Sequence, residues 1–107
     1  MNGTDITLAG FQRQIAGRYE ATDRARGVPR TWMWFIEEVG ELSAALAAVE
    51  KARAAGEAVP EGVRANVAEE FADVLAWLCT LANISDVELA EAVAGKYPAA
   101  GGPEGEK

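Results

Sequence analysis

Acidic residues recur in two similar segments of this sequence, residues 37–42 (EEVGEL) and residues 69–74 (EEFADV). In each segment two carboxylates stand three positions apart, a spacing that places both on one side of a helix. Like charges held that close repel each other, so the clusters by themselves add no stability. A bound divalent cation with oxygen ligands is the simplest compensation.

Four of these carboxylates form a candidate metal site: Glu38, Glu41, Glu70 and Asp73. Their hard oxygens suit Mg²⁺, and also Mn²⁺, better than a soft metal. Such an ion neutralises phosphate charge, and the adjacent Glu37 is a candidate to orient or deprotonate an attacking water. The alternative is a solvated acidic helix face. The pairing favours the metal, because no Lys or Arg stands three or four positions from any of the four.

The apolar periodicity predicts an all-α fold, a compact bundle of three longer helices and one short C-terminal helix. The longer helices are expected at residues 8–26, 31–54 and 63–83, and the short one at residues 85–94. Half of the residues are hydrophobic and only 7% are aromatic, which favours closely packed helices over a β-rich core.

Residue types at the helix ends support these boundaries. Thr7 is expected to cap the first helix, and Ser85 with Glu88 has the spacing of a capping box for the last. No linker divides the chain, so residues 1–98 are expected to form one domain. The Gly-rich residues 99–107 are expected to form a flexible tail.

Apolar residues in the two central helices recur at spacings of three and four, which predicts a core-facing seam on each. Antiparallel packing of these helices across Gly40 and Ala72 would bring the paired acids toward a shared cavity. Trp32 lies in the first seam and is expected in the core. The seam residues are Trp32, Phe35, Val39, Leu42, Leu46 and Val49, followed by Val67, Phe71, Val74, Leu78 and Leu81.

Charge and composition exclude several functions. With 17 acidic and 10 basic residues the net charge is -7, which argues against binding a nucleic acid polymer. The absence of histidine excludes imidazole zinc sites and Ser-His or Cys-His catalysis. The single cysteine, Cys79, is expected to be a buried, inert thiol. No apolar stretch is long enough to span a bilayer, and we expect a soluble cytoplasmic protein with no membrane partner.

The pattern EE-x-x-E at residues 37–41, followed after a gap of 28 residues by E-x-x-D at residues 70–73, resembles that of the MazG-like all-α nucleoside triphosphate pyrophosphohydrolases. The flanking segments agree, with WFI at residues 34–36 and VLAWL at residues 74–78. The resemblance covers most of the chain, roughly residues 11–98.

What the resemblance implies is a Mg²⁺-dependent enzyme that cleaves an NTP or dNTP to the monophosphate and pyrophosphate, often to remove non-standard nucleotides. By carry-over, Glu38, Glu41, Glu70 and Asp73 are the metal ligands, and Glu37 activates water or binds an extra metal. Family members assemble as homo-oligomers, either dimers or tetramers, with sites near subunit contacts. A nucleotide and further copies of the chain are therefore the expected partners.

Four more residues are candidates to contact the nucleotide. Trp34 and Trp77 share helix faces with the acids and could stack on a base. Asn83 could contact base or ribose, or serve as a helix C-cap. Lys96 could act as a point charge on phosphate. Many family members carry a longer basic segment at this place, where the present chain has only residues 94–98 (AGKYP) before its tail.

Two other functions stay open at this point. A non-catalytic helical module that binds a metal, a nucleotide or a partner helix would fit the short C-terminal segment. A phosphoribosyl-ATP pyrophosphohydrolase, from the same superfamily, would use the same carboxylates. A di-iron oxidase is the weakest candidate, because its histidine ligands are missing.

Overall fold

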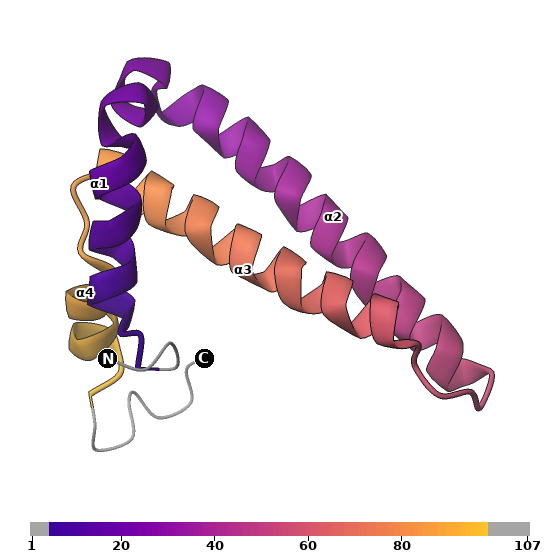
Figure 1. Ribbon diagram of the computed structural model, residues 1–107. Helices are drawn as coiled ribbons and strands as arrows, with labels where there is room; N and C mark the ends of the chain where they lie inside the picture. The colour runs from indigo at the N-terminus through magenta and orange to yellow at the C-terminus, as the bar shows by residue number, and fades with distance from the viewer. Residues whose placement is uncertain (1–4, 99–107) are drawn as a thin grey trace.

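The computed structural model describes residues 5–98, which contain four α-helices and no strand (Figure 1). The all-α prediction is confirmed. The first helix has the predicted bounds, whereas the second and third begin three and two residues earlier than predicted. The predicted tail lies outside the described residues. The helices are α1 (Leu8–Arg26), α2 (Val28–Ala54), α3 (Glu61–Ile84) and α4 (Leu89–Lys96).

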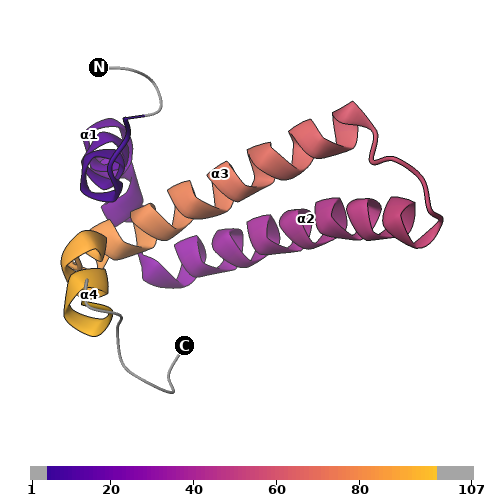
Figure 2. The ribbon, with the colours of Figure 1, turned by 90° about the horizontal axis from the view of Figure 1, so that it is seen from below.

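Helices α2 and α3 run antiparallel as a long hairpin, and α1 packs against the C-terminal half of α3 with α4 beside it (Figures 1 and 2). The hairpin projects as an arm from the α1–α4 end. The radius of gyration is 16.5 Å, whereas a compact domain of this length has about 13 Å. The prediction of a compact bundle is therefore wrong for the single chain, because a two-helix arm has no helix packed on its outer side.

A single residue joins α1 to α2. Gly27 ends α1 and begins α2 with φ at 85°, a conformation that glycine adopts at little cost. Pro29 follows in the first turn of α2, where its missing N–H is not needed. At the other end of α1, the predicted N-cap is confirmed, since the N–H of Gly10 donates to Thr7 Oγ1 at 3.0 Å.

The predicted capping box of the last helix is wrong. Ser85 ends α3 instead, and Asp86 takes the left-handed conformation with φ at 57°. The N–H groups of Asp86 and Val87 donate to the carbonyls of Asn83 and Ala82 at 3.2 and 2.9 Å, the bonding pattern of a Schellman motif. These residues therefore close α3, and α4 begins only at residue 89.

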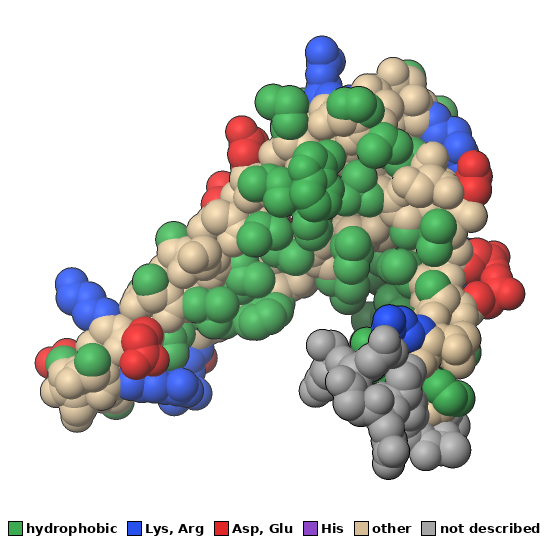
Figure 3. Space-filling model, turned by 180° about the vertical axis from the view of Figure 1, so that it is seen from behind, with side chains coloured by type: hydrophobic (Ala, Val, Ile, Leu, Met, Phe, Trp, Pro, Cys, Tyr) green, Lys and Arg blue, Asp and Glu red, His purple; other side chains and the backbone are tan. Residues whose placement is uncertain are grey.

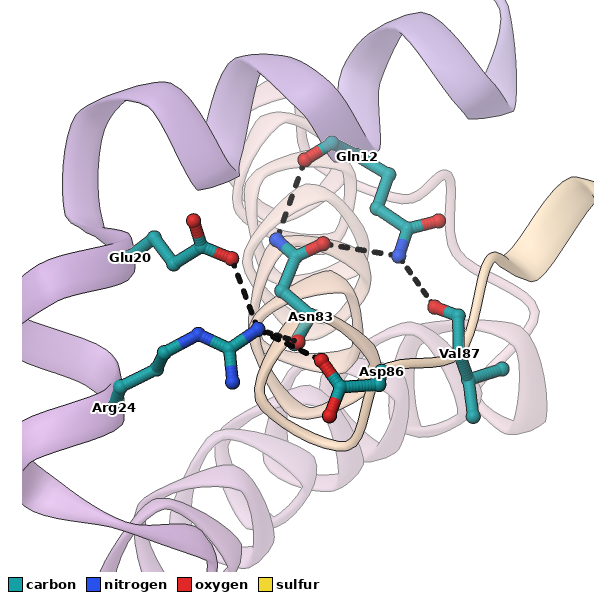
Figure 4. Close-up of polar contacts among 6 residues, drawn as sticks. All are labelled: Gln12, Glu20, Arg24, Asn83, Asp86 and Val87. Carbon is teal, nitrogen blue, oxygen red and sulfur yellow. Dashed lines mark hydrogen bonds and ion pairs between the residues drawn. The ribbon is translucent and has the colours of Figure 1, made fainter.

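A buried glutamine holds the α1, α3 and α4 ends together (Figure 4). Gln12, 6% exposed, donates through Nε2 to Asn83 Oδ1 at 3.0 Å and to the Val87 carbonyl at 2.7 Å. Its Oε1 accepts the N–H of Leu89 at 2.9 Å, so a side chain of α1 caps α4. Nearby, Arg24 of α1 donates to Asp86 Oδ1 at 2.9 Å.

Only half of each predicted seam is covered in the single chain. The members that alternate along the seams, such as Phe35, Leu42 and Val74, are half-buried between α2 and α3. The others are exposed, including Trp32 at 51% and Phe71 at 53%. The expectation that Trp32 lies in the core is therefore wrong. Figure 3 shows apolar side chains gathered in the middle of one face and along the hairpin arm.

Two smaller predictions can be checked. Cys79 is fully buried, and that burial raises the pKa of its thiol, in agreement with an inert cysteine. None of the helices in residues 5–98 has both the length and the apolarity required to cross a bilayer.

Candidate metal centre

The acidic face of α2, like that of α3, consists of four residues that follow one another at spacings of three, four and three positions. Because the helices are antiparallel, the acids of one helix lie opposite the acids of the other near the middle of the hairpin. The aromatic residues meet closer to α1. The two faces consist of Thr31, Trp34, Glu38 and Glu41 on α2 and of Glu70, Asp73, Trp77 and Thr80 on α3.

Three carboxylates converge in the hairpin. Glu38, Glu41 and Glu70 each offer an oxygen within 4.8 Å of the others. Glu38 and Glu70 are half-buried, and Glu41 is exposed. One oxygen of Glu38 and one of Glu70, Oε2 in both, are buried and have no hydrogen-bond partner among the described residues. Buried polar atoms normally have partners, so these two oxygens call for a ligand.

The electrostatics of the cluster show the cost of leaving it without a cation. Burial, followed by the negative charge of Glu41, raises the pKa of both Glu38 and Glu70. None of the ion pairs formed within residues 5–98 includes a member of the cluster. A cation placed among the three would reverse both effects, because it would favour the ionised carboxylates.

The donor set fits a small hard dication. All three groups offer oxygen, no nitrogen or sulfur ligand lies among them, and carboxylates of this kind hold Mg²⁺ or Mn²⁺. One group, Glu41, is exposed, so the site is accessible from solvent. The cluster is therefore suited to hold a metal together with a phosphorylated ligand.

Two predicted site residues lie at the edge of this set. Asp73 is not among the three that converge within 4.8 Å, but its negative charge raises the pKa of Glu38 and of Glu70, so it lies near both. Glu37 is exposed beside Glu38 on α2. Their assigned roles, a fourth ligand and an activator of water, stay predictions.

The two predicted stacking residues meet each other. The rings of Trp34 and Trp77 are T-shaped with centres 5.6 Å apart. The guanidinium carbon of Arg26 lies 4.7 Å from the first ring centre and 5.3 Å from the second, close enough for cation–π attraction to both. An aromatic and cationic cluster thus adjoins the carboxylates.

Arg26 is fixed by buried partners that sequence reasoning missed. Its Nη2 pairs with Asp23 Oδ1 at 2.7 Å, and both side chains are at most 10% exposed. Its Nε donates to Thr31 Oγ1 at 2.9 Å, and that hydroxyl donates to the Gly27 carbonyl at 2.7 Å. The D-x-x-R spacing at the end of a predicted helix was a signal for the ion pair. No pattern in the sequence indicates that this ion pair is buried.

The remaining candidates lie near the α4 end. Asn83 is engaged with Gln12, donating to its carbonyl at 3.3 Å as well as accepting from its side chain. Lys96 ends α4, with its ammonium 5.9 Å from the ring centre of Tyr97. The structure does not bring either residue into the carboxylate cluster, and their contacts with a substrate stay predictions.

Comparison with known proteins gives one match. Residues 29–97, more than half of the chain, match the family model described as the MazG nucleotide pyrophosphohydrolase domain. This range contains the carboxylate cluster and both tryptophans of the aromatic pair. The comparisons with curated proteins and with solved structures gave no match.

Proposed function

We propose, since the chain belongs to the MazG nucleotide pyrophosphohydrolase family, that it hydrolyses a nucleoside or deoxynucleoside triphosphate to the monophosphate and pyrophosphate. The observation that carries the proposal is the convergence of Glu38, Glu41 and Glu70 within 4.8 Å, with two buried oxygens that have no partner in the described part of the chain. Removal of non-standard nucleotides is the expected physiological purpose.

In the proposed site, Glu38, Glu41, Glu70 and Asp73 hold Mg²⁺ or Mn²⁺. The bound dication supplies positive charge that offsets the phosphate oxygens and promotes ionisation of the attacking water. Glu37, exposed next to the ligand set, accepts a proton from that water. The water oxygen bonds to the α-phosphorus, and the bond from that phosphorus to the bridging oxygen breaks, so pyrophosphate leaves.

The rest of the nucleotide is proposed to extend from the carboxylates toward α1. Trp77 follows Asp73 by one helical turn, about 6 Å along the axis, so an indole face lies within reach of the base. Trp34 is 41% exposed and could present its ring as well. Lys96 is proposed as a phosphate contact and Asn83 as a base or ribose contact.

A second copy of the chain is the proposed cover for the hairpin. Trp32, Ile36 and Val39 form an exposed stripe on α2, and Phe71 and Leu75 begin a matching stripe on α3. Stripes of this kind on adjacent helices favour pairing of two hairpins into a four-helix bundle. The acidic faces point elsewhere on both helices, so such pairing leaves the metal site intact.

The proposal is tested by product analysis. The purified chain is incubated with each common NTP and dNTP in Mg²⁺, and the products are separated by anion exchange. Monophosphate and pyrophosphate in equal amounts are expected, and both should vanish when EDTA is added. Release of inorganic phosphate alone, or no turnover with any nucleotide, would contradict the proposed reaction.

Two related functions give different results in the same assay. A non-catalytic module would bind Mn²⁺ or a nucleotide without forming products. A phosphoribosyl-ATP pyrophosphohydrolase would turn over that compound in preference to dNTPs when both compete. The accessible carboxylate cluster favours catalysis over simple binding, because it leaves room for phosphate and water beside the metal ligands.

A further inference from the structure

A cavity between α1 and α3 extends the acidic face of α3 toward the α1–α2 corner. Its volume is about 370 Å³, within the range of sites for small molecules. Asp73 and Trp77 are four residues apart on one face of α3, so the cavity begins about one turn from the carboxylate cluster. Its walls include Tyr19, Thr22, Asp23, Arg26, Trp77 and Thr80.

One wall of this cavity carries an unsatisfied acceptor. Asp23 is 5% exposed, and its Oδ1 accepts from Arg26. Its Oδ2 is buried and has no hydrogen-bond partner among residues 5–98. Arg26 bonds to Oδ1 alone, because its Nη2 donates to that oxygen and its Nε donates to Thr31. A molecule bound in the cavity could supply the donor that this oxygen lacks among the described residues.

We infer that Asp23 selects nucleotides whose base carries an amino group at the pyrimidine C4 or purine C6 position, cytosine or adenine, bound in the cavity between α1 and α3. The inference rests on the proposed function and names the substrate class of that same site. The base lies against Trp77, while the phosphates reach the carboxylate cluster one to two turns along α3.

The selectivity follows from what a carboxylate can do. An ionised Asp only accepts hydrogen bonds, and the amino groups of cytosine and adenine donate them. Uracil and hypoxanthine present a carbonyl at the same place, so two acceptors would face each other. Because Oδ2 is buried in the structure, a bond to the base requires the Asp23 carboxyl to rotate about χ2, a torsion with a broad minimum. Arg26, which is paired with Asp23 in the structure, offsets the negative charge.

Matched substrate pairs test the inference. dCTP and dUTP differ where an amino group replaces a carbonyl, and so do dATP and dITP. For the wild-type chain in Mg²⁺, kcat/KM is expected to favour the amino member of each pair by about 10- to 100-fold, the effect of one hydrogen bond to a charged group. Ratios near one, or a preference for dUTP and dITP, would overturn the inference.

The variant Asp23→Asn isolates the carboxylate. Its amide can donate to a carbonyl as well as accept, so both substrate ratios should fall toward one while pyrophosphate is still released. Asp86→Asn is the matched control, because it changes another Asp paired with Arg, on the surface and away from the cavity, and should retain the wild-type ratios. Unchanged ratios in Asp23→Asn would overturn the inference.

Binding separates this inference from the proposed reaction. Titration calorimetry with dCMP and with dUMP needs no turnover, and dCMP is expected to bind at least about tenfold more tightly. If no triphosphate is hydrolysed but dCMP is preferred, the proposed reaction fails and the cavity assignment stands. If triphosphates are hydrolysed without regard to the amino group, the proposed reaction stands and the cavity assignment fails. The wild-type ratios decide the matter even if Asp23→Asn does not fold.

Discussion

Trp34 of α2 and Trp77 of α3 meet edge to face with ring centres 5.6 Å apart. This contact joins the start of one arm of the hairpin to the end of the other. It therefore fixes how the two antiparallel helices align. On both helices the acids lie one or two turns closer to the hairpin turn than the tryptophans do. With this alignment Glu38, Glu41 and Glu70 come together. The aromatic contact and the carboxylate cluster are consequences of one register.

Loss of Arg26 should destabilise the fold strongly. Arg26→Met removes the partner of the buried Asp23 and leaves its charge uncompensated, which typically costs about 3–5 kcal/mol. The free energy of unfolding, from urea titration followed by circular dichroism, checks this. Arg24→Met is the control, since Arg24 forms exposed ion pairs with Glu20 and Asp86, and its loss should be far smaller. Equal effects of the two variants would contradict the structural role assigned to Arg26.

Neutralising a proposed metal ligand should stop turnover without unfolding the chain. Glu41→Gln and Asp73→Asn each remove one negative charge at nearly constant shape, and kcat/KM should drop by more than about 100-fold, since even groups outside the ligand set often matter that much. Pyrophosphate release is the measurement, with circular dichroism to confirm the helices. Glu50→Gln, an exposed residue farther along α2, should keep full activity. Wild-type rates in both ligand variants would refute the site.

The metal-free chain should become more stable as the pH falls through the raised pKa values of Glu38 and Glu70. The folded chain raises the pKa of Glu38 and Glu70 above the ordinary 4.5. Ionising these groups therefore costs more in the folded chain than in the unfolded one. That cost is absent below about pH 4.5 and complete once the pH exceeds the raised values.

Melting temperatures in EDTA across this pH range measure the effect. The double variant Glu38→Gln with Glu70→Gln should melt higher than wild type at pH 7 and show a weaker dependence on pH. Saturating Mn²⁺ should raise the melting temperature of the wild type and leave that of the double variant nearly unchanged. A double variant that melts lower than wild type in EDTA would argue against mutual repulsion in the cluster.

Gln12 should be important for attachment of α4. Gln12→Leu leaves the Val87 carbonyl, the Leu89 N–H and Asn83 Oδ1 without their partner. Unpaired buried groups of this kind cost about 2–3 kcal/mol in total. Urea unfolding gives the size of the loss, and hydrogen exchange should show faster exchange confined to α4 and the end of α3. Gln14→Leu, at an exposed position of the same helix, is the control.

A charged substitution in the exposed apolar stripe of α3 should dissociate the proposed oligomer into single chains. Sedimentation of the wild type should give about two or four times the 11.3 kDa chain mass. Phe71→Glu should give the single-chain mass, because the ionised carboxylate would be buried at the interface. Val93→Glu, an exposed apolar position on α4, is the matched control and should keep the wild-type mass. A wild type that sediments as a single chain would contradict the proposed assembly.

Local sequence patterns predict most of the helices. The bounds of α1 agree with the prediction because Thr7 and Gly27 act through neighbours in the sequence. The start of α4 was missed because its first N–H is capped by Gln12, 77 residues away. The periodicity predicts that the seams are core because it reports which side of a helix is apolar, and it does not report whether the same chain covers that side.

By itself the sequence determined the helical fold, the paired acids on each helix and the absence of imidazole chemistry, because these depend on residue type and on spacing along one helix. Only the tertiary structure decided which acids converge, that Arg26 lies against two indoles, and that one oxygen of Asp23 receives no hydrogen bond from residues 5–98. Those relations depend on how α1 crosses α3 and how α2 aligns with it, and they arise from packing between residues far apart in the chain.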